Sequence, residues 1–476
     1  MSTLREELTA ALGEDDLITE GDDLAFYGAD RCRGDWPVAP SLVALPRTVE
    51  QVQAVVRACA RHGAAIVPSG GRTGLAGAAT ATQGEVVLSL ERMHRVLEVD
   101  PAARLLRCEA GATVEAVHQA AAAHGLVYPI DFAAKGSAHI GGSIATNAGG
   151  VKVLRYGLTR DWVLGLRVVV ASGECLELGG ALVKNNTGYD LRQLFIGAEG
   201  TLGVVVEATL RLCAPPPGRV VALCAVPDEA RVLELFARVR AHGLTLQAFE
   251  CFDAGCLRRV LEHRGRADAG PFDPPSSQHA LVEVEVLQPG DDAREATYDA
   301  LAECLADAQD AGTITDAVLA ASEHQALELW ALREDTSESL HRHHPHKSDI
   351  AVPVAALPRF LAAWRQCVAE HLPGVEAVVF GHIGDGNLHL NLLQPEQEPL
   401  ADFQARCRAF DAHSYALVAA HHGSVSAEHG IGLLKREHLH FSRSPGELAM
   451  MRAIKQALDP KGLFNPGKVL VDHAAP

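Results

Sequence analysis

A glycine-rich reversal between two β-prone runs constrains the fold of this chain more than any other segment. Residues 378–383 and 388–393 are apolar, and the Gly-Asp-Gly-Asn stretch at 384–387 tolerates the backbone angles of a tight turn. If those four residues form the loop of a hairpin, His382 pairs directly with His389. Directly opposed residues share one face of a sheet with Cβ atoms about 5 Å apart. Two imidazoles at these positions can therefore bind one metal ion.

A third metal ligand is needed, and the segment at 426–432 supplies candidates. Its sequence, SAEHGIG, places Glu428 and His429 between small residues that allow a loop to carry them to the hairpin. Ligation by His382, His389 and Glu428 would leave an open coordination position, which is typical of a catalytic rather than a structural site. His429 could then act as a base. The alternative is that these are ordinary polar residues of a sheet and a turn, but their combination favours a functional site.

Composition limits the classes of protein to consider. With 476 residues the chain is too long for one core and should form two or three domains. A formal net charge of −18 argues against a nucleic-acid surface. Eleven cysteines without a CxxC pair indicate reduced thiols in the cytoplasm. No apolar run is long enough for a transmembrane helix or a signal peptide.

The first half alternates helices and strands with glycine-rich loops. Thr48 and Gln51 form a capping-box pattern, and Gly63 should end the helix that follows. The segments at 68–80, 139–150 and 183–212 combine glycines with small hydroxyl residues, and the third also contains an apolar, strand-like run. A loop of this kind can direct several backbone amides at phosphate oxygens, although one such loop is a weak signal. Three of them suggest a groove for an extended phosphorylated cofactor.

These segments also carry a family resemblance. PSGGRTGLAG, HIGGSIATNAGG, GAEGTLGVVVEATLRL and the terminal LDPKGLFNPGKVL resemble the FAD-binding domain of the vanillyl-alcohol oxidase and p-cresol methylhydroxylase superfamily. GHIGDGNLHLNLL and AEHGIGLLKRE resemble the branch of D-2-hydroxyglutarate and D-lactate dehydrogenases. The resemblance implies an α+β protein with a p-cresol methylhydroxylase-type FAD-binding domain at 1–215, an α+β substrate domain with the metal hairpin at 216–425, and a segment at 426–476 that returns to complete the active site and the FAD site.

By the resemblance, FAD would be held by the glycine-rich loops and by the C-terminal turn. The loop at 68–77 would hold the pyrophosphate, and the loop at 141–150 would line the flavin. Gly200 and Val205 would contact the adenine end or the ring, and Asn465 in the C-terminal turn would return to the flavin. The expected contacts are Pro68, Ser69, Gly70, Gly71, Arg72, Thr73, Gly74, Gly77, Gly141, Gly142, Ser143, Thr146, Asn147, Gly150, Gly200, Val205 and Asn465. Arg72 stands where some members attach FAD through a histidine, so the FAD should be non-covalent.

The resemblance also assigns the catalytic centre. His382, His389 and Glu428 match metal ligands, with Zn²⁺ expected and Mn²⁺ as the alternative, and His429 matches the catalytic base. The positions that match substrate contacts are Arg333, Ser337, Lys347 and Asn391. The spacing from Arg333 to Lys347 is one residue shorter than the family pattern. The intervening run HRHHPHK is interpreted as a solvated loop.

The function implied is oxidation of a D-2-hydroxy acid to the 2-oxo acid by hydride transfer to flavin N5. D-2-hydroxyglutarate is the first candidate, with D-malate next, because Arg333 and Lys347 can pair with a remote carboxylate. The competing functions are D-lactate or glycolate dehydrogenase and, less favoured, a non-catalytic flavin or metal carrier. An electron-transfer flavoprotein or a quinone is the expected electron acceptor, and a homodimer is the assembly considered.

Overall fold

The computed structural model describes residues 3–32, 36–266 and 270–471, which form two compact units. The first unit comprises 1–150, 157–215 and 428–476, and the second comprises 151–156 and 216–427. Both units combine helices with β-sheets, which confirms the predicted α+β class. Within the described residues, no helix has both the length and the apolar character that a membrane span requires.

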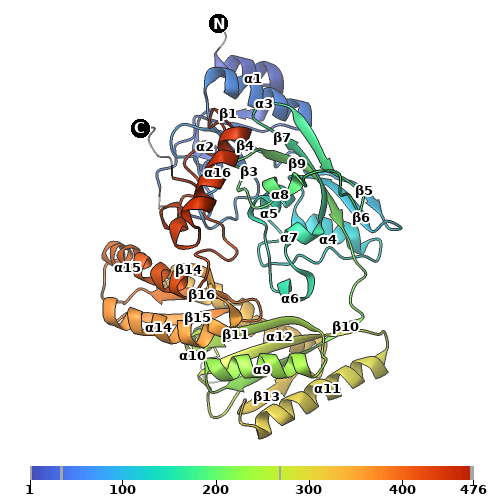
Figure 1. The fold of residues 1–476 in the computed structure, drawn as a ribbon, viewed down its shortest axis with the longest axis vertical. Helices are drawn as coiled ribbons and strands as arrows, with labels where there is room; N and C mark the ends of the chain where they lie inside the picture. Colours follow the sequence, from blue (N-terminus) through green and yellow to red (C-terminus); the bar gives the residue numbers. More distant parts are fainter. Residues whose placement is uncertain (1–2, 33–35, 267–269, 472–476) are drawn as a thin grey trace. The chain divides into compact units, whose positions relative to one another are not determined.

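The first unit contains two sheets. A four-stranded sheet has the order β1-β2-β4-β3, and a five-stranded antiparallel sheet has the order β5-β6-β9-β7-β8. Their strands are β1 (Leu17–Ile18), β2 (Leu42–Ala44), β3 (Ile66–Ser69), β4 (Val86–Ser89), β5 (Val96–Asp100), β6 (Leu105–Glu109), β7 (Val163–Val169), β8 (Cys175–Gly179) and β9 (Val204–Arg211). The helices are α1 (Leu4–Leu12), α2 (Asp22–Tyr27), α3 (Val49–His62), α4 (Val114–Ala122), α5 (Ile140–Thr146), α7 (Thr159–Trp162), α8 (Arg192–Phe195) and α16 (Pro445–Leu458). Figure 1 shows these elements coloured along the chain.

Local capping explains where the main helices of this unit begin and end. The Thr48 side chain accepts the amide of Gln51 at the start of α3, and Gly63 ends that helix in the left-handed conformation, as predicted. The predicted capping box is only half formed, because the Gln51 side chain accepts the amide of Arg47 at 2.7 Å instead of that of Thr48. Thr113 caps α4 in the same way by accepting the amide of Ala116. Between these two helices, β3 follows α3 and leads directly into the first glycine-rich loop.

The second unit is built on one seven-stranded sheet of order β13-β10-β12-β11-β15-β16-β14. Its strands are β10 (Gly218–Val226), β11 (Leu246–Asp253), β12 (Gln278–Val286), β13 (Asp316–Leu319), β14 (His346–Ala351), β15 (Glu376–His382) and β16 (Asn387–Leu393). Its helices are α6 (Val153–Tyr156), α9 (Glu229–Ala241), α10 (Ala254–His263), α11 (Asp291–Asp310), α12 (Glu323–Glu334), α13 (Thr336–Ser339), α14 (Leu357–His371) and α15 (Leu400–Ala420). All the strand pairs in this sheet are antiparallel.

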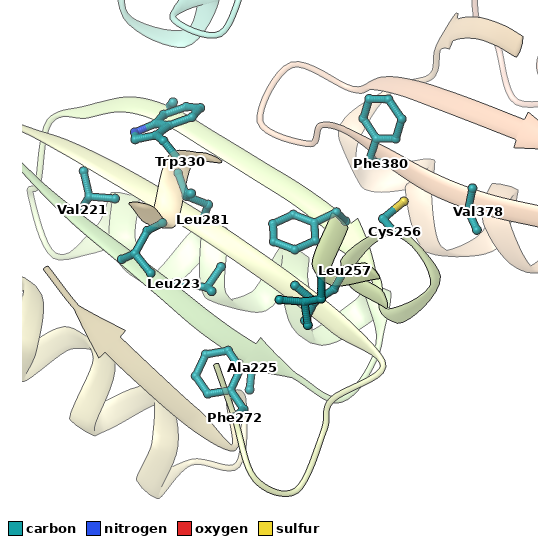
Figure 2. Packing of buried hydrophobic residues seen from close by; sticks show 14 of the residues in the cluster. Val221, Leu223, Ala225, Cys256, Leu257, Phe272, Leu281, Trp330, Val378 and Phe380 are labelled. Carbon is teal, nitrogen blue, oxygen red and sulfur yellow. The ribbon is translucent and has the colours of Figure 1, made fainter. Parts of the chain in front are cut away.

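Helices cover both faces of the seven-stranded sheet. On one face α10 and α12 contribute Cys256, Leu257 and Trp330 to a buried cluster with Val378 and Phe380 of β15 (Figure 2). On the opposite face α9 packs against β11, where the rings of Phe236 and Phe249 are 5.0 Å apart. The indole of Trp330 also donates a 2.7 Å hydrogen bond to the buried carboxylate of Glu283. The Glu283 carboxylate on this face is therefore shielded from water.

Candidate metal and flavin site

The predicted hairpin is present, but its register differs from the prediction. Phe380, not His382, lies opposite His389, and the turn falls at 383–386 instead of 384–387. Gly386 has a φ of +84°, so the reversal is completed there and Asn387 becomes the first residue of β16. The predicted direct His382–His389 pairing is therefore wrong.

The two histidines still meet on one face, because the register is displaced by an even number of residues. Side chains alternate with a period of two along a strand, so this displacement keeps both rings on the same side of the sheet. They are diagonal neighbours, with ring centroids 5.5 Å apart and planes at 80°. Both side chains are largely buried, with 9% of His382 and 14% of His389 exposed. The geometry of a two-imidazole metal site is thus retained.

Each of these histidines has a buried carboxylate opposite it on the neighbouring strand. Glu250 of β11 pairs with His382 of β15, and Asp349 of β14 pairs with His389 of β16. The four side chains form a row across β11, β15, β16 and β14, on one face. Carboxylates in this position typically orient metal-ligating histidines and raise their basicity.

Glu250 connects His382 to Arg333. Its Oε1 atom lies 2.7 Å from His382 Nδ1, and its Oε2 atom lies 2.8 Å from Arg333 Nη2. Burial raises the pKa of the Glu250 carboxyl, but the charges of His382 and Arg333 outweigh it, so the pKa falls below its usual value. Because Nδ1 of His382 is engaged by this carboxylate, a metal ion would be bound through Nε2.

Asp349 connects the hairpin to the segment that precedes Glu428. Its Oδ1 atom accepts a 2.9 Å hydrogen bond from Asn387 and lies 3.9 Å from His389 Nδ1. Its Oδ2 atom accepts the backbone amide of Ala427 at 3.1 Å. Asp349 therefore fixes the end of the chain segment from which Glu428 and His429 continue, and both of those side chains are half-buried.

Three of the four predicted substrate residues, Arg333, Lys347 and Asn391, lie at the same face of the sheet. Lys347 pairs with Asn391 across β14 and β16, two positions from the Asp349–His389 pair, so the short spacing still puts Lys347 on this face. The Arg333 guanidinium lies over the ring of Phe380, with its central carbon 4.7 Å from the ring centroid. Ser337 is exposed on α13. The histidine-rich run is not the solvated loop that was predicted, because His341–His343 form a 3-10 helix and His346 begins β14, where it bonds to Asp411 at 2.8 Å.

In the first unit, the first two glycine-rich loops lie against each other. Pro68 and Ser69 end β3, and a Cβ atom on Gly71 would lie 1.9 Å from the carbonyl oxygen of Ser137. A Cβ atom on Gly70 would lie 3.4 Å from His139 Cβ. Only glycine at position 71 permits this approach of the backbones.

The second loop begins as helix α5, whose glycines serve different purposes. A Cβ atom on Gly141 would lie 2.8 Å from Ala110 Cβ, so this glycine packs inside the unit. Gly142 faces open space, since a Cβ atom there would meet no other atom within 4 Å. The hydroxyls of Ser143 and Thr146 donate to carbonyls of the same helix, at 3.1 Å each. Asn147 and Gly150 end the segment with positive φ angles of 50° and 141°.

The third loop meets the C-terminal turn. A Cβ atom on Gly200 would lie 3.2 Å from Pro68 and 3.3 Å from Asn465 Nδ2. Asn465 donates to the carbonyl oxygens of Ala78 and Glu199, at 3.0 and 2.7 Å. Glu199 and Gly200 of the third segment thus lie against the first loop and the C-terminal turn within this unit, and Val205 follows on β9, buried.

Some buried polar atoms around these loops have no hydrogen-bond partner among the described residues, which fits a bound polar cofactor. Across the described residues, the buried atoms Ser69 Oγ, His139 Nδ1 and Asn465 Oδ1 make no hydrogen bond within the protein. Buried polar atoms are rarely left unsatisfied without a ligand or water. Burial and the nearby Arg72 lower the pKa of His139 to about 4, so its imidazole is neutral at pH 7. These groups would suit FAD.

Two acidic residues that the sequence reading missed hold the loops in place. Asp30 accepts the amide of Cys32 at 2.9 Å and the hydroxyl of Thr80 at 3.2 Å, at the far end of the first loop. Glu199 accepts the amides of Ile431 and Gly432, at 2.8 Å each. Burial raises the pKa of Glu199 to about 7. Nothing local in the sequence distinguishes either residue from a surface acid.

The remaining predicted residues of the first loop are occupied by protein contacts. The Arg72 guanidinium carbon lies 4.8 and 4.4 Å from the ring centroids of Phe26 and Tyr27, and Arg72 Nη1 donates to the Gly70 carbonyl at 3.3 Å. Gly77 has a φ of +77° beside Leu433. Two further predicted positions complete the loop: Thr73 is half-buried, and a Cβ atom on Gly74 would lie 3.5 Å from Asp30 Oδ2.

Comparisons with known proteins agree with this architecture. Residues 215–469 match the protein family described as FAD linked oxidases, C-terminal domain, and residues 40–179 match the family described as FAD binding domain. A D-2-hydroxyglutarate dehydrogenase from Xanthomonas citri pv. viticola is 49% identical over 97% of this chain and 95% of its own length. One from Stutzerimonas stutzeri is 44% identical over 98% of each chain, and a mitochondrial one from Bos taurus is 41% identical over 90% of this chain and 76% of its own.

Solved structures show the same fold at low sequence identity. p-Cresol methylhydroxylase, solved with substrate bound, superposes with a TM-score of 0.78 at 18% identity, over 98% of this chain and 96% of its own. Alkyldihydroxyacetonephosphate synthase superposes with a TM-score of 0.72 at 19% identity, over 97% and 85%. The expected p-cresol methylhydroxylase-type fold is therefore confirmed.

Proposed function

Since this chain belongs to the FAD-linked oxidases, in the family of the D-2-hydroxyglutarate dehydrogenases, we propose that it oxidises D-2-hydroxyglutarate to 2-oxoglutarate with the help of a divalent metal ion. It is an FAD-dependent dehydrogenase, so the hydride removed from the substrate passes to the flavin. The observation that supports the metal requirement is the buried row of Glu250, His382, His389 and Asp349 across one face of the sheet.

Each residue has a distinct role in the proposed reaction. His382 and His389 bind the cation with Glu428, which follows the segment that Asp349 holds. When bound, the cation lowers the pKa of the substrate hydroxyl. A ring nitrogen of His429 takes the hydroxyl proton, because an imidazole titrates near neutral pH. Zn²⁺ suits two imidazoles and one carboxylate, with Mn²⁺ as the alternative.

A dicarboxylate substrate is supported by the charges near the histidines. Arg333 uses Nη2 for Glu250 and the face of its guanidinium for Phe380, whereas its buried Nε makes no hydrogen bond among the described residues. A guanidinium has five N–H donors, so donors remain for a substrate carboxylate. Lys347 and Asn391, paired on neighbouring strands, add an ammonium and an amide to the same face. Ser337 is a further proposed contact.

A substrate panel tests this proposal. Metal-loaded holoenzyme is assayed with D-2-hydroxyglutarate, D-malate, D-lactate and glycolate, using an artificial dye as electron acceptor. We expect kcat/KM to be highest for D-2-hydroxyglutarate, because a site that pairs a charge rejects analogues that leave its groups unmatched. A preference for D-lactate or glycolate would replace this assignment with the competing one. Activity that survives complete metal removal would refute the metal requirement.

The electron acceptor, location and assembly are further parts of the proposal. Reduced FAD must be reoxidised, and an electron-transfer flavoprotein or a quinone would serve. Eleven cysteines without a disulfide support a cytoplasmic location. A homodimer is proposed as the assembly. Dye-free assays with each acceptor, cell fractionation and light scattering test these three points separately.

A further inference from the structure

Glu250 is placed to act on two parts of the proposed site at once. It lies in the middle of β11 and is 1% exposed. One of its carboxylate oxygens faces the metal-ligand histidine His382, and the other faces Arg333, the proposed partner of the remote substrate carboxylate. The contacts are short, at 2.7 and 2.8 Å.

We propose that Glu250 is a positioning residue that couples metal binding at His382 to recognition of the remote carboxylate at Arg333. This inference rests on the proposed function. It adds that the two ends of the substrate are not recognised independently. The metal ligand His382 acts at one end and the Arg333 guanidinium at the other, and both contact the single buried carboxylate of Glu250. Glu250 itself touches neither substrate nor metal.

The physical basis is the sharing of one negative charge. A carboxylate behind a ligating histidine fixes the ring orientation and raises its basicity, and its loss typically costs 10- to 100-fold in metal affinity. The same carboxylate neutralises part of the guanidinium charge, because the pair is buried and poorly screened by solvent. Any change at Arg333 therefore alters how much of the Glu250 charge acts on His382.

A second contact fixes the geometry of this unit. The Arg333 guanidinium lies over the Phe380 ring, and the Phe380 ring centroid is 4.8 Å from that of His389. Arg333 is thus linked to both histidines, through Glu250 to one and through Phe380 to the other. A shift of the guanidinium would therefore disturb a neighbour of each of the two histidines.

A double-mutant cycle on the metal-binding step tests the coupling. The affinity of the FAD-loaded protein for Zn²⁺ is measured by competition with a chromogenic chelator in wild type, Glu250→Gln, Arg333→Met and the double variant. Glu250→Gln should weaken binding by about 10- to 100-fold, because the uncharged amide can still accept from His382 but no longer raises its basicity with a negative charge. Arg333→Met should tighten it by about fivefold or more, because the full carboxylate charge then acts on His382.

The decisive result is the effect of Arg333→Met in the Glu250→Gln background. If the coupling runs through Glu250, this effect should disappear there. The same shift in both backgrounds, or no shift from Arg333→Met in the native background, would overturn the proposal. The second outcome can be read even if Glu250→Gln fails to fold.

Glu283→Gln is the matched control for loss of a buried carboxylate. Glu283 lies on the neighbouring strand β12, is fully buried and is bonded to Arg219 and Trp330, at 2.9 and 2.7 Å. It should leave Zn²⁺ affinity unchanged, even if it lowers stability. A loss equal to that of Glu250→Gln would reduce Glu250 to a general structural role and refute the positioning role.

Substrate selectivity provides a separate measurement. Glu250→Gln should change the ratio of kcat/KM for D-2-hydroxyglutarate to that for D-lactate, as well as the Zn²⁺ affinity. A wild type that binds no Zn²⁺ would refute the proposed metal site and this coupling together. A wild type that binds Zn²⁺ but prefers D-lactate would refute only the substrate assignment. If wild type binds Zn²⁺ and prefers D-2-hydroxyglutarate, but the effects of Glu250→Gln and Arg333→Met on Zn²⁺ affinity are additive, only the coupling is refuted.

Discussion

The substitution Gly142→Ala separates the fold of helix α5 from its expected contact with the flavin. A Cβ atom at this position would meet nothing within 4 Å in the protein, so the methyl group causes no internal clash. Alanine in a helix is favoured over glycine by about 1 kcal/mol. The FAD-free protein should therefore be as stable as wild type or slightly more stable, by up to that amount.

FAD binding should respond in the opposite direction. If the flavin lies against Gly142, the methyl group intrudes on the bound cofactor, and overpacking of this kind costs about 1–3 kcal/mol. That corresponds to a weakening of the FAD dissociation constant by about 5- to 150-fold. The assay is a fluorescence titration of FAD into apoprotein, with thermal unfolding of the same apoprotein measured in parallel.

Two controls make the result specific. Gly446→Ala also adds a methyl group to a helical glycine of the same unit, whose nearest neighbour would be Ser444 Oγ at 4.0 Å, and should leave FAD affinity unchanged. Gly71→Ala should impair both folding and FAD binding, because its Cβ atom would lie 1.9 Å from a backbone oxygen. If Gly142→Ala binds FAD as tightly as wild type, the open face of α5 does not contact the flavin.

Four further predictions follow from the sites described. The Glu199 pKa rises from 4.5 to about 7 on folding, so its contribution of about 3 kcal/mol to the unfolding free energy is present below pH 4.5 and is lost as the pH rises to 7. Urea unfolding at several pH values should show that the unfolding free energy of Glu199→Gln changes less with pH than that of wild type. Parallel pH dependences in the two proteins would contradict this prediction. His382→Ala and His389→Ala should each lose bound metal but keep the flavin spectrum, whereas His429→Ala should keep metal and lose about 10²-fold in rate. Metal analysis distinguishes these outcomes. Metal loss only in His429→Ala would reverse the assignment of metal ligand and catalytic base. Lys347→Met should lower kcat/KM for D-2-hydroxyglutarate by about 30- to 150-fold and spare D-lactate, and equal losses would exclude a role at the remote carboxylate. Acid precipitation should release FAD into the supernatant, and flavin retained in the pellet would show a covalent bond.

Local sequence patterns were sufficient for much of the first unit. The caps of α3 and α4 depend on residues three positions apart, so they can be read without knowing the fold. The glycine-rich loops were recognisable by composition, and the structure brings them together within that unit. The individual roles within the loops were less accessible, because Ser143 and Thr146 satisfy their hydroxyls inside α5 and Gly142 alone faces open space.

The strand periodicity was enough to predict that His382 and His389 share one face, because the observed register differs from the predicted one by an even number of residues. It could not determine the register, which depends on where Gly386 completes the turn. The positions of Glu250 and Asp349 opposite these histidines follow from long-range strand pairing, which could not be predicted from the sequence. Glu250 and His382 are 132 residues apart along the chain, and they meet because β11 is the neighbour of β15 in the sheet. This order depends on pairing between strands that lie far apart in the chain, which no local pattern encodes.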